Sequence, residues 1–140
     1  MEALTFEESR SASISVTDTV GVEDARRLVR SFCLDVGMSR LRAEELVLAT
    51  SEIATNLVRH STEGGTITCR LLSHNRGVEV ESLDSGPGIP DIDEAMKAGF
   101  STSERRSLGS GLSSARDLVD EFEIQSAPGA TRIRMRKWLN

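Results

Sequence analysis

Two polar side chains four residues apart, Glu52 and Asn56, lie in a segment whose other residues are largely aliphatic. In a helix, residues at this spacing point the same way from successive turns. Asparagine is unfavourable in mid-helix, and a carboxylate among aliphatic groups costs free energy unless it is paired or solvated. One interpretation places both side chains on the wet edge of the helix. The other is chemical: the Asn56 amide oxygen binds a hard cation such as Mg²⁺, and Glu52 accepts a proton from a hydroxyl or orders a metal-bound water.

A carboxylate followed by a glycine- and proline-rich turn forms a second candidate site. Asp84 begins the stretch DSGPGIP, which directly follows a strand-like run ending at Leu83. Proline fixes φ and donates no hydrogen bond, whereas Gly86 and Gly88 allow another group to approach bare backbone. A surface turn with an Asx-type cap is the simpler interpretation. The functional one is that Asp84 accepts a hydrogen bond from a flat polar ligand while the glycines clear space for its ring.

A third candidate is the segment Gly109, Ser110 and Gly111, which directly precedes a predicted helix starting at Gly111 or Leu112. Backbone N–H groups at a helix N-terminus, together with the helix dipole, form a ready site for phosphate. The segment matches neither the P-loop nor the dinucleotide-binding fingerprint. Its serines are equally compatible with plain helix capping, so the segment alone does not decide between the two.

Alternating helical and extended patterns must position these candidates. The pattern predicts strands over residues 13–17, 66–73, 78–84, 121–126 and 131–137. It predicts helices over 22–36, about 40–61, 91–97 and 111 or 112–120, with Ser39 as an N-cap and Gly37 just beyond the first helix. Residues 99–107 are expected to form a polar, flexible lid.

The predicted strands have one apolar and one charged face. Such a sheet carries helices on one side and water on the other, so we expect an α/β (α+β) two-layer sandwich with a mixed, mostly antiparallel sheet. Asp84 and Thr131 fall on the inward face with the apolar residues. A polar pair on a buried face needs a partner, and a bound ligand would supply one.

Composition limits the class of protein. A chain of 140 residues, 28% charged and 38% hydrophobic, predicts a single globular domain over 1–140, with residues 1–11 flexible. The net charge of −5 argues against nucleic-acid binding. The sequence has no apolar run of membrane-spanning length and no signal peptide, so we expect a cytoplasmic protein without a membrane partner. Cys33 and Cys69 are expected to be buried free thiols rather than a disulfide or metal ligands.

Together the motifs resemble the GHKL ATPases, whose ATP-binding core is the Bergerat fold. The resemblance rests on EIATN, DSGPGIPDIDEAMKAGFST, LVDEFEI and the closing MRKWL, and it extends from about residue 18 onward. Their order and spacing are similar to the small serine/threonine kinases of anti-sigma regulation, in particular the switch kinases of the stressosome. A histidine kinase catalytic domain is not expected, because no dimerisation and phosphoacceptor segment precedes the motifs.

The resemblance implies ATP and Mg²⁺ as cofactors and gives each candidate a role. It makes Asn56 the Mg²⁺ ligand, Glu52 the general base for the substrate hydroxyl, and Asp84 the acceptor for the adenine amino group. It implies further cofactor contacts through the purine pocket and the phosphates, from Gly86, Gly88, Thr131, Gly109, Ser110 and Gly111. Arg106 would steady the γ-phosphate or remain a solvated lid charge. The glycine run is poorer here than in the relatives, because residues 104–107 read ERRS, which implies a stiffer lid.

The implied function is an ATP-dependent protein serine/threonine kinase. Its substrate would be a STAS-domain antagonist in a partner-switching stress pathway, and phosphorylation would break the complex by placing negative charge in the interface. The freed kinase would then engage another partner, such as a PP2C-type phosphatase. The alternatives are an anti-sigma factor that sequesters a sigma subunit, and a nucleotide-gated scaffold with little turnover.

Overall fold

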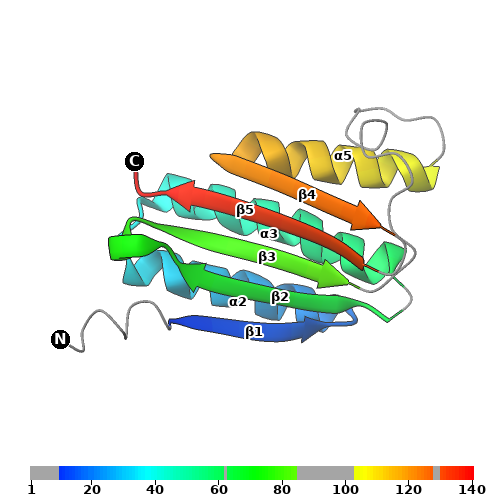
Figure 1. Ribbon diagram of the computed structural model, residues 1–140, viewed down its shortest axis with the longest axis horizontal. Coiled ribbons are helices and arrows are strands. Elements are labelled where there is room, and N and C mark those ends of the chain that lie inside the picture. The colour runs from blue at the N-terminus through cyan, green and yellow to red at the C-terminus, as the bar shows by residue number, and fades with distance from the viewer. Residues whose placement is uncertain (1–9, 62, 85–102, 128–129) are drawn as a thin grey trace.

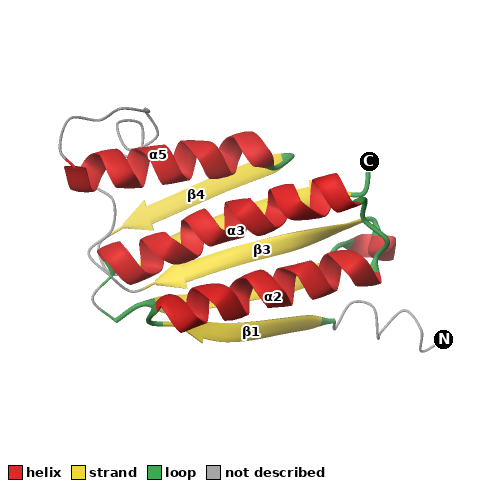
Figure 2. Ribbon diagram, turned by 180° about the vertical axis from the view of Figure 1, so that it is seen from behind, coloured by secondary structure: helices red, strands yellow, loops and turns green. Residues whose placement is uncertain are grey.

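One layer of helices covers one face of a five-stranded sheet (Figures 1 and 2). The computed structural model describes residues 10–61, 63–84, 103–127 and 130–140, without the side chains of residues 60, 103–110 and 127. The strands are β1 (Ser11–Val16), β2 (Gly65–Leu71), β3 (Gly77–Asp84), β4 (Glu121–Ala127) and β5 (Ala130–Trp138). They are arranged in the order β1-β2-β3-β5-β4, with β1 at an edge. All four pairings are antiparallel, so the described strands form no mixed sheet.

The first two helices of the layer begin and end at residues that the sequence explains. Helix α2 (Thr19–Asp35) starts earlier than predicted because the Asp18 carboxylate accepts a hydrogen bond from Gly21 N at 3.1 Å. Gly37, just beyond its end, has a φ of 75°, a value that favours glycine. Helix α3 (Arg40–His60) begins at the predicted cap, where Ser39 Oγ accepts from Arg42 N at 3.3 Å.

The third helix is longer than its sequence pattern indicates. Helix α5 (Ser103–Leu118) begins at Ser103, not at Gly111 or Leu112, so that prediction is wrong. Residues 103–107 of the predicted lid are helical in this structure. Glutamate, arginine and leucine in this segment are good helix formers, and each helical glycine costs only about 1 kcal/mol relative to alanine. The rest of the predicted lid (99–102), the predicted helix over 91–97 and residues 1–9 lie outside the described residues.

The hairpin between β2 and β3 turns through a short 3-10 helix, η1 (Ser73–Asn75). His74 and Asn75 both have positive φ there, at 60° and 55°. Asparagine and histidine tolerate this region better than most residues, which explains how the HNRG sequence reverses the chain.

The inward face of the sheet and the inner faces of the helices form the hydrophobic core. Ile67, Cys69, Val80 and Met135 are fully buried on the sheet, as their parity predicts, and Leu46 and Ile53 of α3 are fully buried above them. The two-layer architecture predicted from strand parity is therefore confirmed. Within the described residues, no helix has the length and apolar character needed to cross a membrane.

The outer face of the sheet carries a lattice of alternating charges. We call it the charge lattice; its members are Arg70, Arg132, Arg134, Arg136, Glu79, Glu81, Glu121 and Glu123. Glu79 is only 5% exposed, and its carboxylate accepts hydrogen bonds from Arg70 at 2.8 Å and Arg136 at 2.9 Å. Because antiparallel register places these residues directly opposite one another, each acid is flanked by cations on the neighbouring strand.

A buried lysine joins the sheet to two helices. Lys137 is 4% exposed on the inward face of β5, and Nζ donates to Glu45 Oε1 of α3 at 2.8 Å and to the Leu118 carbonyl of α5 at 2.6 Å. The carbonyl ends a helix, where the dipole favours a cation. Strand parity alone places Lys137 inward, but the sequence does not identify its partners.

Both cysteines are free and fully buried, as predicted. Loss of solvation raises the pKa of the Cys33 thiol to about 12 and raises that of Cys69 as well. Since the thiolate is the reactive form, we expect neither thiol to react with Ellman's reagent at pH 8 in the native protein. Both should react once the chain is unfolded in guanidinium. Rapid stoichiometric labelling of the native protein would contradict the burial.

Candidate active site

Three residues named by the sequence come together where α5 approaches α3. A Cβ placed on Gly111 would lie 3.1 Å from Glu52 Oε1 and 3.6 Å from Asn56 Oδ1. Glu52 and Asn56 are on successive turns of α3, so both side chains face the same stretch of α5 backbone. The absence of a side chain at Gly111 is therefore what leaves room for the two polar groups.

The Asn56 amide has an unmet hydrogen-bonding requirement. Its Nδ2 atom is buried and has no hydrogen-bond partner in the structure. A buried polar group without a partner costs about 1–3 kcal/mol, so such a group in a native fold needs an explanation. A bound polar ligand beside Asn56 would satisfy the amide. This observation fits the presence of a metal–phosphate group at the site.

The donor set is too small to hold a metal without help. The described part of the chain contains no group of three or more His, Cys, Asp or Glu side chains placed to bind one ion. Mg²⁺ characteristically takes one or two protein oxygens and completes its shell with water and phosphate. Asn56 is therefore compatible with a metal that arrives with a nucleotide.

Asp84 ends β3 between a glycine and a hydroxyl pair. On one side it is paired in register with Gly65 of β2, and on the other with Thr131 of β5. The Thr131 hydroxyl is 2.8 Å from that of Ser126, and Thr131 is 6% exposed. The predicted inward pairing of Asp84 with Thr131 is therefore confirmed. Ser126 and Gly65 were missed, because nothing in their local sequence pattern marks them as neighbours of Thr131 and Asp84.

The two groups of residues lie at the same end of the molecule. A Cβ on Gly65 would meet Leu57 Cδ2 at 2.8 Å and Asp84 Cβ at 3.2 Å. Leu57 is the neighbour of Asn56 in α3, so the last turns of α3 lie over the end of β3. Figure 2 shows this arrangement, with the tip of β3 beneath the C-terminal end of α3.

The remaining predicted site residues divide into two sets. Gly86 and Gly88 lie outside the described residues. Gly109, Ser110 and Arg106 lie inside α5, described by backbone alone. The prediction that the glycine segment opens a helix is wrong, because these residues follow the first turn of α5. Their N–H groups are internal to a helix in this structure.

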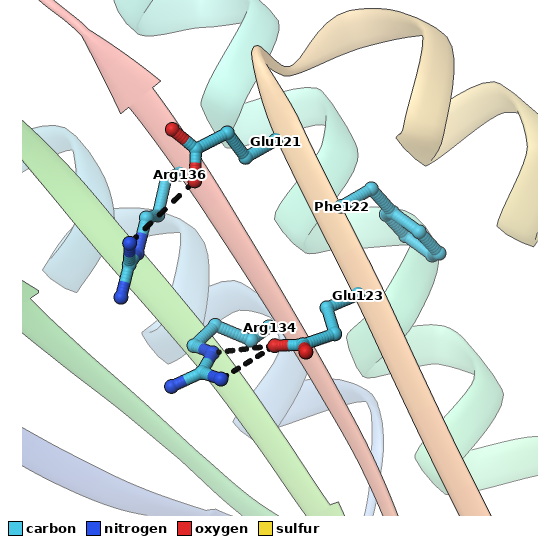
Figure 3. A pocket seen from close by; sticks show the side chains of 5 residues that line it. All are labelled: Glu121, Phe122, Glu123, Arg134 and Arg136. Carbon is cyan, nitrogen blue, oxygen red and sulfur yellow. Dashed lines mark hydrogen bonds and ion pairs between the residues drawn. The ribbon is translucent and has the colours of Figure 1, made fainter.

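A hollow on the opposite side of the sheet is a different feature. It is lined by Glu121, Phe122, Glu123, Arg134 and Arg136 (Figure 3). Arg134 Nη2 is 2.5 Å from Glu123 Oε1, and Arg136 Nη1 is 3.5 Å from Glu121 Oε1. These charges neutralise one another on the outer face, whereas Glu52 and Asn56 lie in the helix layer. The hollow is therefore not part of the candidate active site.

A family model described as "Histidine kinase-like ATPase domain" matches residues 15–137, nearly the whole chain. The chain belongs to this family. It is 35% identical over 117 residues to "Serine/threonine-protein kinase RsbT" of Bacillus subtilis, which covers 82% of this chain and 86% of RsbT. It is 32% identical over 119 residues to "Anti-sigma F factor" of Caldanaerobacter subterraneus, covering 82% of this chain and 83% of that protein. The family resemblance read from the motifs is confirmed.

Solved structures confirm the fold of this histidine kinase-like ATPase domain. The chain matches the RsbU and RsbW domains of Rv1364c from Mycobacterium tuberculosis with a TM-score of 0.66 and 18% identity. That match covers 93% of this chain and 32% of the other. A second match is the SiaB–SiaC complex from Pseudomonas aeruginosa, with a TM-score of 0.61, 13% identity and coverage of 96% and 93%.

Replacing Gly111 with alanine should separate stability from ligand binding. Alanine is the better helix residue, by about 1 kcal/mol, which offsets the crowding against Glu52. We expect G111A to melt at or above the wild-type temperature yet bind Mg·ATP more weakly, because the new methyl group displaces the Glu52 and Asn56 side chains. Calorimetric unfolding and titration measure the two effects. S114A, at an exposed position of the same helix, is the control and should bind normally. Equal affinities of G111A and S114A would contradict the close approach.

Proposed function

We propose that the chain is an ATP- and Mg²⁺-dependent protein serine/threonine kinase whose substrate is a STAS-domain antagonist. The observation that carries the proposal is the cluster of Glu52 and Asn56 against the bare backbone of Gly111. Phosphoryl transfer to a hydroxyl needs positioning, charge neutralisation and a proton acceptor. The name of the Bacillus subtilis relative, a serine/threonine-protein kinase, supports the same activity.

The residues at the end of the sheet bind the nucleotide base in this proposal. Asp84 accepts a hydrogen bond from the adenine amino group, with Thr131 supporting the base through water. Gly86 and Gly88 shape the purine pocket. Gly109, Ser110, Gly111 and Arg106 hold the phosphates, which requires the first turns of α5 to open, because their N–H groups lie inside the helix.

The residues of α3 handle the metal and the proton. Asn56 holds Mg²⁺ through its amide oxygen, and a phosphate oxygen of the nucleotide would accept a hydrogen bond from its unpartnered Nδ2. Mg·ATP, when bound, supplies the phosphoryl group and neutralises the charge that develops during its transfer. Glu52 orients the acceptor hydroxyl and takes its proton as the oxygen bonds to phosphorus.

Phosphorylation ends the complex with the substrate. A phosphate carries about −1.5 to −2 charges at pH 7, so it disrupts a packed interface. The freed kinase then engages a second partner, for which a PP2C-type phosphatase is our candidate, in a stressosome-like pathway. The protein works in the cytoplasm, where ATP is supplied and thiols stay reduced.

A second candidate function is supported by helix α5. Its backbone is helical from Ser103, and this withholds the N–H groups of the glycine segment from phosphate. Such a chain could bind partners strongly and turn over slowly, as a nucleotide-gated scaffold or an anti-sigma factor. The resemblance to an anti-sigma F factor supports the same alternative.

The substitution E52Q tests the kinase. Glutamine keeps the size of the side chain but takes no proton, so we expect phosphoryl transfer to a STAS-domain protein to fall roughly 10²–10⁴-fold. ATP binding and complex formation should persist. Phosphate incorporation is read by intact mass at saturating Mg·ATP. Wild-type rates for E52Q would exclude the base role. A stable complex with no transfer by either form would favour the scaffold.

The substitution D84N tests the base pocket. Asparagine loses the charge and turns one hydrogen-bond acceptor into a donor, so ATP affinity should fall by roughly tenfold to a hundredfold while the fold is retained. Titration calorimetry measures the affinity, and circular dichroism checks the fold. The same loss should appear with ADP, because adenine is common to both. Unchanged ADP affinity would remove Asp84 from the pocket.

A further inference from the structure

Two leucines stand exposed on the solvent-facing ridge of α3. Leu41 is 71% exposed and Leu48 is 51% exposed. They are seven residues apart, so they project from the same side of the helix. We call this pair the α3 ridge. Other residues of α3 already fill its core-facing side, so the ridge contributes nothing to the core. These buried residues include Leu46, Val47, Ile53 and Ala54.

The ridge runs directly into the candidate active site. Glu52 follows Leu48 by four residues, which is one turn, or about 6 Å along the helix axis. Leu41 lies about 16 Å from Glu52 along the helix axis. Within the part of the chain that the structure describes, neighbouring elements flank the ridge without covering it. Helix α5 contacts α3 through Gly111 on one side, and Arg30 of α2 holds Glu44 of α3 on the other, at 2.9 Å.

We propose that the α3 ridge is the docking surface for the folded protein domain that carries the acceptor serine or threonine, an inference that rests on the proposed kinase function. A hydroxyl that gives its proton to Glu52 must come within about 3 Å of that carboxylate. The domain that carries the hydroxyl must then lie over the surface around Glu52. Leu48 is the large exposed apolar side chain next to that point.

The size of a protein interface supports the assignment. A standard interface covers about 800 Å² on each partner, equivalent to a disc of about 16 Å radius. A disc of that size centred on Glu52 contains Leu48 and reaches Leu41. The partner therefore presents apolar side chains beside its acceptor residue, one of which packs on Leu48. Hot spots of this kind lie near the centre of an interface and carry most of its binding energy.

Leu34 provides a matched control. It is 72% exposed on α2, as exposed as Leu41. Arg30 pairs with Glu44, and Leu34 lies one turn beyond Arg30, alongside the start of α3. It lies on a different helix from the α3 ridge, so its replacement tests whether loss of any exposed leucine has the same effect.

The experiment compares L48Q, L48M, L41Q and L34Q in the full chain. Glutamine is a good helix former and adds no charge beside Glu52, so folding and the proton acceptor are undisturbed. The probe is a purified STAS-domain protein encoded in the same genome. Steady-state phosphorylation gives kcat and KM, and calorimetry gives the Kd for the STAS domain and for Mg·ATP.

We expect L48Q to raise KM and the Kd for the STAS domain by about tenfold or more, with kcat and ATP affinity unchanged. L41Q should have a smaller effect, L48M should restore binding, and L34Q should match the wild type. Wild-type KM for L48Q, or an equal loss in L34Q, would overturn the proposal. So would a wild-type dimer that L48Q dissociates with no change in KM, since a second copy would then cover the ridge.

The outcomes also separate this inference from the proposed function. If the wild type transfers phosphate and L48Q has wild-type KM and Kd, the result supports the kinase function and overturns the α3 ridge as the docking surface. A wild-type complex without transfer overturns the kinase, and a weaker Kd for L48Q then still supports the ridge. If the wild type shows neither phosphoryl transfer nor binding of the STAS domain, both the kinase function and the α3 ridge proposal are overturned.

Discussion

The position of α5 over α3 depends on one buried ammonium group. Lys137 donates to Glu45 of α3 and to the last carbonyl of α5, and it does so beneath both helices. Arg42 reinforces the same end by donating to the Trp138 carbonyl at 2.9 Å and to Asp120 at 2.5 Å. Removing one partner of a buried ion pair leaves an uncompensated charge, which is more damaging than replacing both. This junction fixes the end of α5 that lies away from the candidate active site.

The opposite half of α5 faces the candidate active site. Gly111 lies seven residues before Leu118, about 10 Å along the axis, and a Cβ there would lie 3.1 Å from Glu52 Oε1. Two glycines lower the helix propensity of this half. The other half, whose last carbonyl accepts a hydrogen bond from Lys137, packs Leu112 and Ala115 in the core. The helix is thus anchored at one end and weak at the other, where the nucleotide phosphates are proposed to bind.

Local patterns predicted the parts of the site that depend on periodicity. The four-residue spacing placed Glu52 beside Asn56, and strand parity placed Asp84 opposite Thr131. The start of α5 was not predictable in this way, because helix formers and glycines compete within ERRSLGSG and the local pattern favours neither a helix nor a loop. Gly65 and Lys137 were missed for a related reason. Their roles depend on partners distant in sequence, Asp84 in one case and Glu45 in the other.

The charge lattice on the outer face has a consequence for the approach of ligands. It contains four arginines and four glutamates, so it contributes no net charge. The whole excess of −5 therefore belongs to the rest of the chain. A protein with this imbalance repels a nucleotide polyanion at long range, and that repulsion fades as added salt shortens the Debye length from about 10 Å at 0.1 M. Association with ATP should therefore quicken with moderate ionic strength, the reverse of the behaviour of a basic phosphate-binding surface.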